Sequence, residues 1–80
     1  MTDTMALRHA IEKSGLKYGR IAAEMGISSY TLQKKIDNVV EFKASEIAKL
    51  SSLLSLGDTE RSSIFFAQQV IINHHKSGGR

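Results

Sequence analysis

Several residue types and patterns are missing from this chain of 80 residues, and each absence excludes a class of protein. There is no cysteine, which excludes disulfides, thiolate zinc sites and cysteine nucleophiles and predicts a reducing, cytoplasmic environment. No apolar run approaches the length of a membrane span, and the N-terminus lacks a signal-peptide pattern. There is also no proline. The abundant Leu, Ile, Ala and Lys therefore favour one small, all-helical domain with a modest core.

Motifs for catalysis, cofactors and metals are missing as well. The chain has no glycine-rich phosphate loop, and its few carboxylates do not form a motif that would gather them around a reacting centre. His9 stands beside an apolar stripe without a partner at metal-ligand spacing, and the adjacent His74 and His75 are poorly placed for joint binding on a helix. We therefore expect a protein that is not an enzyme and that needs no cofactor or metal.

The net charge is small, but its position in the chain is informative. The chain carries 11 Lys and Arg against 8 Asp and Glu, a net charge of +3. Residues 17–36 hold four of the cations (Lys17, Arg20, Lys34 and Lys35) and one anion, Glu24, whereas the rest of the chain holds seven of each sign. The whole formal excess therefore lies in one short stretch, which indicates a polyanionic partner there.

That stretch, Lys17 to Ile36, has the pattern of two short helices joined by a tight turn. Its apolar side chains recur at helical spacing in two groups, Ile21, Ala22 and Met25, then Leu32 and Ile36. Gly26 lies between the groups, where glycine can adopt the left-handed conformation of a turn. Ser28 follows it as a good N-cap for the second helix. The pattern is typical of a helix-turn-helix of DNA-binding proteins.

The second helix has an outward face if its two apolar side chains point inward. Four side chains then fall together on that face, at helical spacing: Ser29, Tyr30, Gln33 and Lys34. Gln33 can pair bidentately with adenine, and Lys34 can donate to guanine or to a phosphate. Ser29 can donate or accept. Tyr30 can contact a thymine methyl group or pack against the loop that follows.

The order of residues in this stretch also resembles a known family. Ile21-Ala22, Met25-Gly26-Ile27-Ser28, Thr31-Leu32 and Lys35-Ile36 look like the helix-turn-helix of bacteriophage repressor and Cro proteins and their bacterial relatives, the XRE-type regulators. The similarity continues through residues 41–47 and covers roughly Leu7 to Phe66. It implies a five-helix, lambda-repressor-like DNA-binding domain.

The resemblance also implies contacts with DNA. Base contacts in the major groove would come from the outward face described above. Phosphate contacts would come from Lys17, Tyr18, Ser28, Lys35, Asn38 and Lys43. Tyr18 can equally pack its ring, and Asn38 can reach a base edge instead. Val39 and Val40 depart from the family, in which many members carry a small polar loop with glycine. We expect these valines and Phe42 to cover the core, with exposure of one valine as the alternative.

Three further helices are predicted around the central pair. The first is capped by Asp3 or Thr4 after a frayed start over residues 1–3, and it ends at Ser14-Gly15. Its apolar stripe includes Leu7 and Ile11. On this helix Arg8 and Lys13 lie off the stripe, where they can approach the phosphate backbone, but the interpretation as ordinary solvent-exposed cations is preferred. The fourth helix, residues 44–54, carries its inner face on Ile47, Leu50 and Leu54.

The fifth helix, predicted over residues 59–72, is apolar over most of its circumference. One small core can cover only part of such a surface, so the other part predicts contact with a second copy of the chain. We expect that interface to include Phe65, Phe66, Val70 and Ile72. The domain organisation is then a DNA-binding domain over 1–72, ending in a dimerisation helix, and a flexible tail over 73–80.

Two functions fit these observations. The first is a cytoplasmic, nucleoid-associated transcriptional regulator that binds double-stranded DNA as a homodimer and occupies an operator through the major groove. The second is a modulator that uses the same fold to bind a partner repressor protein. Fold alone does not separate the two. The positive charge on residues 17–36 favours the first.

Overall fold

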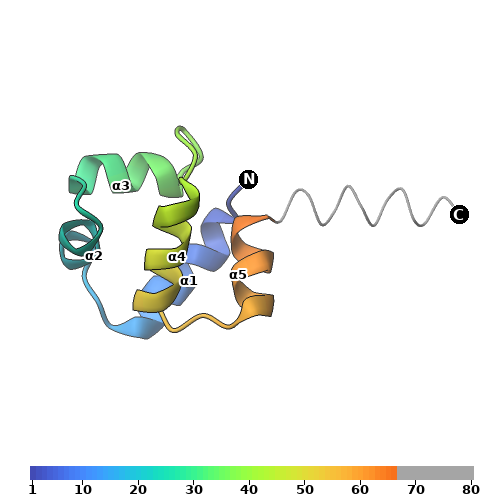
Figure 1. Ribbon diagram of the computed structural model, residues 1–80. Coiled ribbons are helices and arrows are strands. Elements are labelled where there is room, and N and C mark those ends of the chain that lie inside the picture. Colours follow the sequence, from blue (N-terminus) through green and yellow to red (C-terminus); the bar gives the residue numbers. More distant parts are fainter. Residues whose placement is uncertain (67–80) are drawn as a thin grey trace, which may run out of the picture.

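The computed structural model describes residues 1–66, and its regular structure in that range is entirely helical (Figure 1). The helices are α1 Thr4–Ser14, α2 Tyr18–Met25, α3 Ser29–Ile36, α4 Ala44–Leu53 and α5 Asp58–Phe65. The predicted five-helix, all-α fold is therefore confirmed. None of these helices combines the length and apolar character that are needed to cross a membrane.

The ends of α1 follow from its flanking residues. The Asp3 carboxylate accepts a hydrogen bond from the backbone N–H of Ala6 at 3.1 Å, which satisfies one of the donors left free at a helix start. At the other end Gly15 has φ of 77°, a left-handed conformation that stops the helix at Ser14. Both boundaries agree with the sequence prediction.

The core is formed by apolar side chains from all five helices. α2 lies against α3 and α4, while α1 lies against α3 and α5. The buried apolar residues are Leu7, Ile11, Ile21, Ala22, Leu32, Ile36, Leu50, Leu54, Ile64 and Phe65. Full burial of a leucine or isoleucine side chain is worth about 1.5–3 kcal/mol, so this core is the main source of stability.

The N-terminal segment and the first residue of α1 are bonded to the ends of α3 and α5. The backbone N–H of Asp3 donates to the Ile64 carbonyl of α5 at 2.6 Å. The Thr4 hydroxyl donates to the Ile36 carbonyl of α3, also at 2.6 Å. Thr2 is buried, and its backbone N–H and carbonyl bond to the Asn38 side chain just after α3. The expectation that residues 1–3 are frayed was therefore wrong for Thr2 and Asp3.

The structure of α5 corrects one predicted interface residue. Phe65 is 3% exposed, and its ring meets the ring of Phe42 edge to face with centroids 5.5 Å apart. It belongs to the core of this chain and is not available to a second copy. Phe66 is 40% exposed. The other predicted interface residues, Val70 and Ile72, and the predicted tail over 73–80 lie outside the described residues.

The loop between α3 and α4 also differs from expectation. Val39 and Val40 are 67% and 42% exposed, so they do not cover the core, whereas Phe42 does pack against it. The backbone N–H groups of both valines point to the Lys34 carbonyl at the end of α3, at 2.9 and 3.3 Å. This arrangement caps α3 and leaves the valine side chains in solvent.

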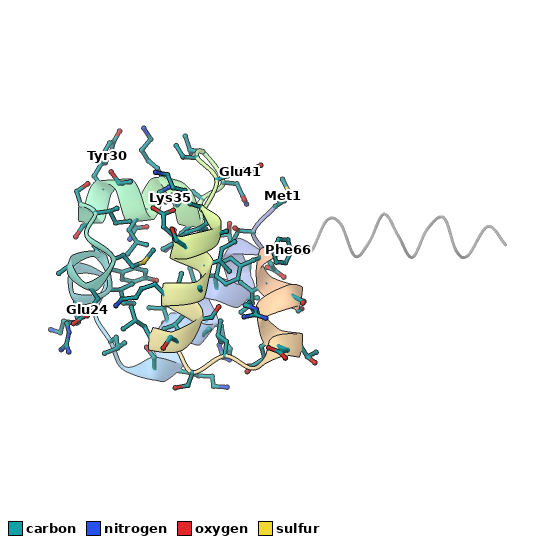
Figure 2. All side chains as sticks on the ribbon, in the orientation of Figure 1. Met1, Glu24, Tyr30, Lys35, Glu41 and Phe66 are labelled. Atoms are coloured by element: carbon teal, nitrogen blue, oxygen red, sulfur yellow. The ribbon has the colours of Figure 1, made fainter. Side chains whose placement is uncertain are left out.

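Lys35 was predicted to contact a phosphate, and the structure contradicts this. Its ammonium lies 2.9 Å from the Glu46 carboxylate of α4, with the two side chains 6% and 13% exposed, and it also donates to the Glu41 carbonyl at 3.1 Å. In Figure 2, Lys35 lies on the side of α3 toward α4. The ion pair therefore fixes α3 against α4, and its cation is withdrawn from the surface.

Glu46 has a second role at the start of α4. Its carboxylate accepts the backbone N–H of Lys43 at 2.8 Å, as in a capping box. Burial by itself raises the pKa of the Glu46 carboxyl, but the Lys43 N–H and the Lys35 ammonium lower it below its ordinary value. The charged form of Glu46 therefore stabilises the fold.

Replacing Glu46 by glutamine should cost stability at neutral pH and much less in acid. We expect Glu46→Gln to lower the free energy of unfolding by about 1–3 kcal/mol at pH 7, because a buried ammonium loses its charged partner. Since folding lowers this pKa, the stabilisation is present above the unfolded value of 4.5 and is lost as the pH falls through the folded value. Urea denaturation from pH 7 down to pH 2 measures the difference.

The matched control is Glu24→Gln. Glu24 pairs with Arg20 at 3.4 Å, with side chains 40% and 65% exposed. Surface pairs of this kind contribute about 0–1 kcal/mol, so this variant should follow the wild type. A stability loss in Glu46→Gln that is equal at every pH would contradict the assignment.

Candidate nucleic-acid interface

The turn between α2 and α3 is built by two residues. Gly26 has φ of 72° and its N–H bonds back to the end of α2, so the chain reverses there at no steric cost. The Ser28 hydroxyl then accepts the backbone N–H of Thr31 at 3.0 Å, which starts α3. The same hydroxyl donates to the Thr31 side chain at 2.9 Å. The cap uses a lone pair of the Ser28 oxygen, whereas the bond to the Thr31 hydroxyl engages the proton that the predicted phosphate contact of Ser28 needs.

The register of α3 agrees with the sequence prediction. Leu32 and Ile36 are completely buried, so the opposite face of the helix points to solvent. Ser29 and Tyr30 on that face are exposed, while Gln33 and Lys34 are partly exposed. Figure 2 shows Tyr30 on the side of α3 away from α4. The four predicted base-contacting residues therefore lie together on one accessible face, which we call the α3 face.

Two residues of the α3 face contact each other. The Lys34 ammonium lies 5.2 Å from the centroid of the Tyr30 ring, within the range of a cation–π interaction worth about 0.5–1 kcal/mol at an exposed site. Tyr30 is 72% exposed, so it does not pack against the following loop, which was the alternative. The contact limits the positions that the Lys34 side chain takes before any ligand arrives.

Gln33 has a partner that the sequence did not reveal. Arg8 of α1 donates through Nη2 to the Gln33 Oε1 oxygen at 3.3 Å and to the Asp37 carboxylate at 2.7 Å. The bond to Asp37 raises the pKa of Arg8 above its ordinary value, against the smaller effect of burial. Arg8 was interpreted as an ordinary surface cation, and no local pattern marks it, because its two partners are more than 20 residues away.

Asn38 was predicted to contact a phosphate or a base edge, and its amide is already occupied. Its oxygen accepts the backbone N–H of Thr2 at 2.9 Å, and its nitrogen donates to the Thr2 carbonyl at 2.7 Å and to the Thr4 hydroxyl at 3.3 Å. Its φ of 64° is left-handed, a conformation that asparagine tolerates. Asn38 therefore anchors the N-terminal segment to the end of α3.

At the start of α2, Lys17 and Tyr18 have different environments. Lys17 is exposed and makes no side-chain capping bond, so its ammonium is free for an anion. Tyr18 is partly buried, with its ring against the core, as the packing alternative expected. The free N–H groups of the first turn of α2 lie beside Lys17 and favour negative charge.

The structure also redistributes the charge of residues 17–36. Arg20 pairs with Glu24, and Lys35 pairs with Glu46. In the described part of the chain, Lys17 and Lys34 make no ion pair, and neither does Lys43 at the start of α4. α4 begins beside the C-terminal end of α3 (Figure 1). Three unpaired lysines thus come from α3 and from the starts of α2 and α4.

Within residues 1–66 there is no group of His, Asp or Glu side chains that could hold a metal ion. The side chains of the α3 face supply hydrogen-bonding groups, an aromatic ring and positive charge. This set of groups can bind a surface that combines hydrogen-bonding edges, apolar groups and negative charge.

Comparison with known proteins gives one match. The model of a family described as "Protein of unknown function (DUF739)" matches residues 4–68, a range that includes all five described helices. No curated protein and no solved structure matches the chain.

Proposed function

The chain belongs to the DUF739 family, whose description names no activity, and from the geometry of the α3 face we propose that it is a sequence-specific DNA-binding transcriptional regulator. In this proposal the protein resembles bacteriophage repressors and Cro proteins, and α2 and α3 act as a helix-turn-helix. α3 enters the major groove of an operator.

The observation that carries the proposal is the accessible α3 face. An α-helix with its side chains is about 10–12 Å wide, which matches the major groove of B-DNA. Leu32 and Ile36 anchor the back of α3 in the core. Its front presents a hydroxyl, an aromatic ring, an amide and an ammonium group, the kinds of group that contact base edges and thymine methyls.

Positive charge around α3 supports the same proposal. Lys34 lies on the α3 face, Lys17 precedes α2 and Lys43 precedes α4, and none of them is paired with a carboxylate of residues 1–66. Phosphate contacts from flanking elements position a recognition helix without reading sequence. Lys17 and Lys43 are suited to that role, whereas Lys34 can reach a base or a phosphate.

The proposal is tested by selecting bound sites from random duplex DNA and comparing Gln33→Ala with the wild type. We expect the wild type to enrich one short sequence. Gln33→Ala should relax the preference at one position of each half-site and lose about 1–3 kcal/mol on the selected duplex. Gln33 is outside the core, so thermal stability should change little. Equal weakening on selected and scrambled duplexes would contradict base contact by Gln33.

Lys43→Ala should instead weaken binding to all duplexes alike. If Lys17, Lys34 and Lys43 each neutralise one phosphate, the log–log dependence of affinity on salt should have a slope of about −5 for a dimer. Lys43→Ala should reduce its magnitude by about one per subunit. Fluorescence anisotropy across a salt series measures both values.

Lys13→Ala is the matched control for the salt series. Lys13 is an exposed lysine in the last turn of α1, beside the loop that precedes α5 and away from α3. Its removal should leave the slope unchanged. An equal effect of Lys13→Ala and Lys43→Ala would mean that the protein attracts DNA only through its net charge.

We also propose that the regulator is a homodimer. Met1 and Phe66 are exposed apolar side chains near the point where the start of α1 meets the end of α5 (Figure 2). Met5, in the first turn of α1, is also exposed. Light scattering at micromolar concentration should give twice the monomer mass, and Phe66→Glu should lower it toward the monomer. Val40→Glu changes a similarly exposed apolar residue elsewhere and should not. A wild-type monomer, both free and on DNA, would contradict the dimer.

The alternative function is binding to a partner repressor protein. The exposed Val39 and Val40 beside the C-terminal end of α3 favour it, because apolar side chains at the centre of an interface are typical of protein partners. Selection from random DNA separates the two functions. Absence of any enriched sequence, together with affinity that does not depend on salt, would favour the protein partner.

A further inference from the structure

We propose that Arg8 of α1 is a positioning residue that sets the base preference of Gln33. The inference rests on the proposed DNA-binding function and extends it to the chemistry of one contact. Arg8 holds the amide oxygen of Gln33, so that the amide offers the DNA chiefly its nitrogen donor. Gln33 should then prefer a base edge with acceptors, guanine above all, over adenine.

The hydrogen-bonding chemistry of Arg8 determines which end of the Gln33 amide faces it. A guanidinium group only donates hydrogen bonds. The amide atom 3.3 Å from Arg8 Nη2 must therefore be the oxygen. Asp37 stands four residues after Gln33, one helical turn on, and accepts from the same Nη2 at 2.7 Å. Arg8 is thus held by a carboxylate at the end of α3 in a position where it meets the Gln33 oxygen.

The adenine contact requires both ends of the amide. Glutamine pairs bidentately with adenine by accepting from N6 and donating to N7. To do so here, the Gln33 oxygen would have to leave Arg8 or share its lone pairs with it. Guanine presents two acceptors in the major groove, O6 and N7, and thymine presents O4. The Nε2 donor of Gln33 can serve these edges while the oxygen stays on Arg8.

The Arg8–Asp37 ion pair also contributes to the fold, and the experiment has to separate that effect. Arg8→Met removes the donor to the Gln33 oxygen together with the cation of the ion pair, so the Gln33 oxygen becomes free. Asp37→Asn removes the ionic partner but leaves Arg8 able to donate to Gln33. A merely structural role predicts similar behaviour of the two variants, whereas the proposed role predicts a change of base preference in Arg8→Met only.

The test measures affinity for four duplexes that differ at the base pair contacted by Gln33. This base pair is identified in the selected site as the position at which Gln33→Ala relaxes the sequence preference. The wild type should bind the guanine duplex about tenfold more tightly than the adenine duplex. Arg8→Met should abolish or reverse this ratio, and Asp37→Asn should keep it. Arg8→Ala is a second variant that frees the Gln33 oxygen, and circular dichroism checks the fold of each variant.

The outcomes are distinct. A wild-type preference for adenine, or a ratio unchanged in both Arg8 variants while specific binding persists, would overturn the role of Arg8 and leave the DNA-binding function standing. Absence of any sequence-specific duplex binding by the wild type would overturn the proposed function and this inference together.

Discussion

The position of α3 is the constraint on which the rest of the structure depends. An isolated helix of eight residues is not stable in water, so tertiary contacts must hold this one. Leu32 and Ile36 are completely buried and set which face points outward. Side-chain bonds then fix the C-terminal half of α3: Glu46 of α4 holds Lys35, and Arg8 of α1 holds Gln33 and Asp37.

These bonds divide the polar residues of α3 and its flanks into two groups. Lys35, Asn38 and Asp37 serve the fold, because each is bonded to another element. Ser29, Tyr30 and Lys34 make no hydrogen bond or ion pair to another described element and remain available to a partner. Gln33 belongs to both groups, since its oxygen is held by Arg8 and its nitrogen is not. The functional proposals concern the second group and Gln33.

The internal ion pairs also change which cations near α3 are available to a partner. The formal excess on residues 17–36 comes from four cations, but two of them are used internally or by a neighbour on the same helix. Lys43, from the start of α4, adds to the two that remain. Within residues 1–66, the unpaired lysines on α3 and at the starts of α2 and α4 are therefore Lys34, Lys17 and Lys43, a set that differs from the one that a count along the sequence suggests. A count of charged residues along the sequence gives the formal charge, whereas the electrostatic field at a surface depends on which of those charges are paired.

The sequence alone determined the features that depend on neighbouring residues. The caps at Asp3 and Ser28, the turns at Gly15 and Gly26 and the inward face of α3 all follow from local conformation and helical spacing, and all were predicted. The tertiary structure alone decided which polar side chains are free. Lys35 and Asn38 have partners 11 and 36 residues away, and Phe65 has its partner 23 residues earlier. Such pairings arise only when helices pack together, because no local spacing encodes them.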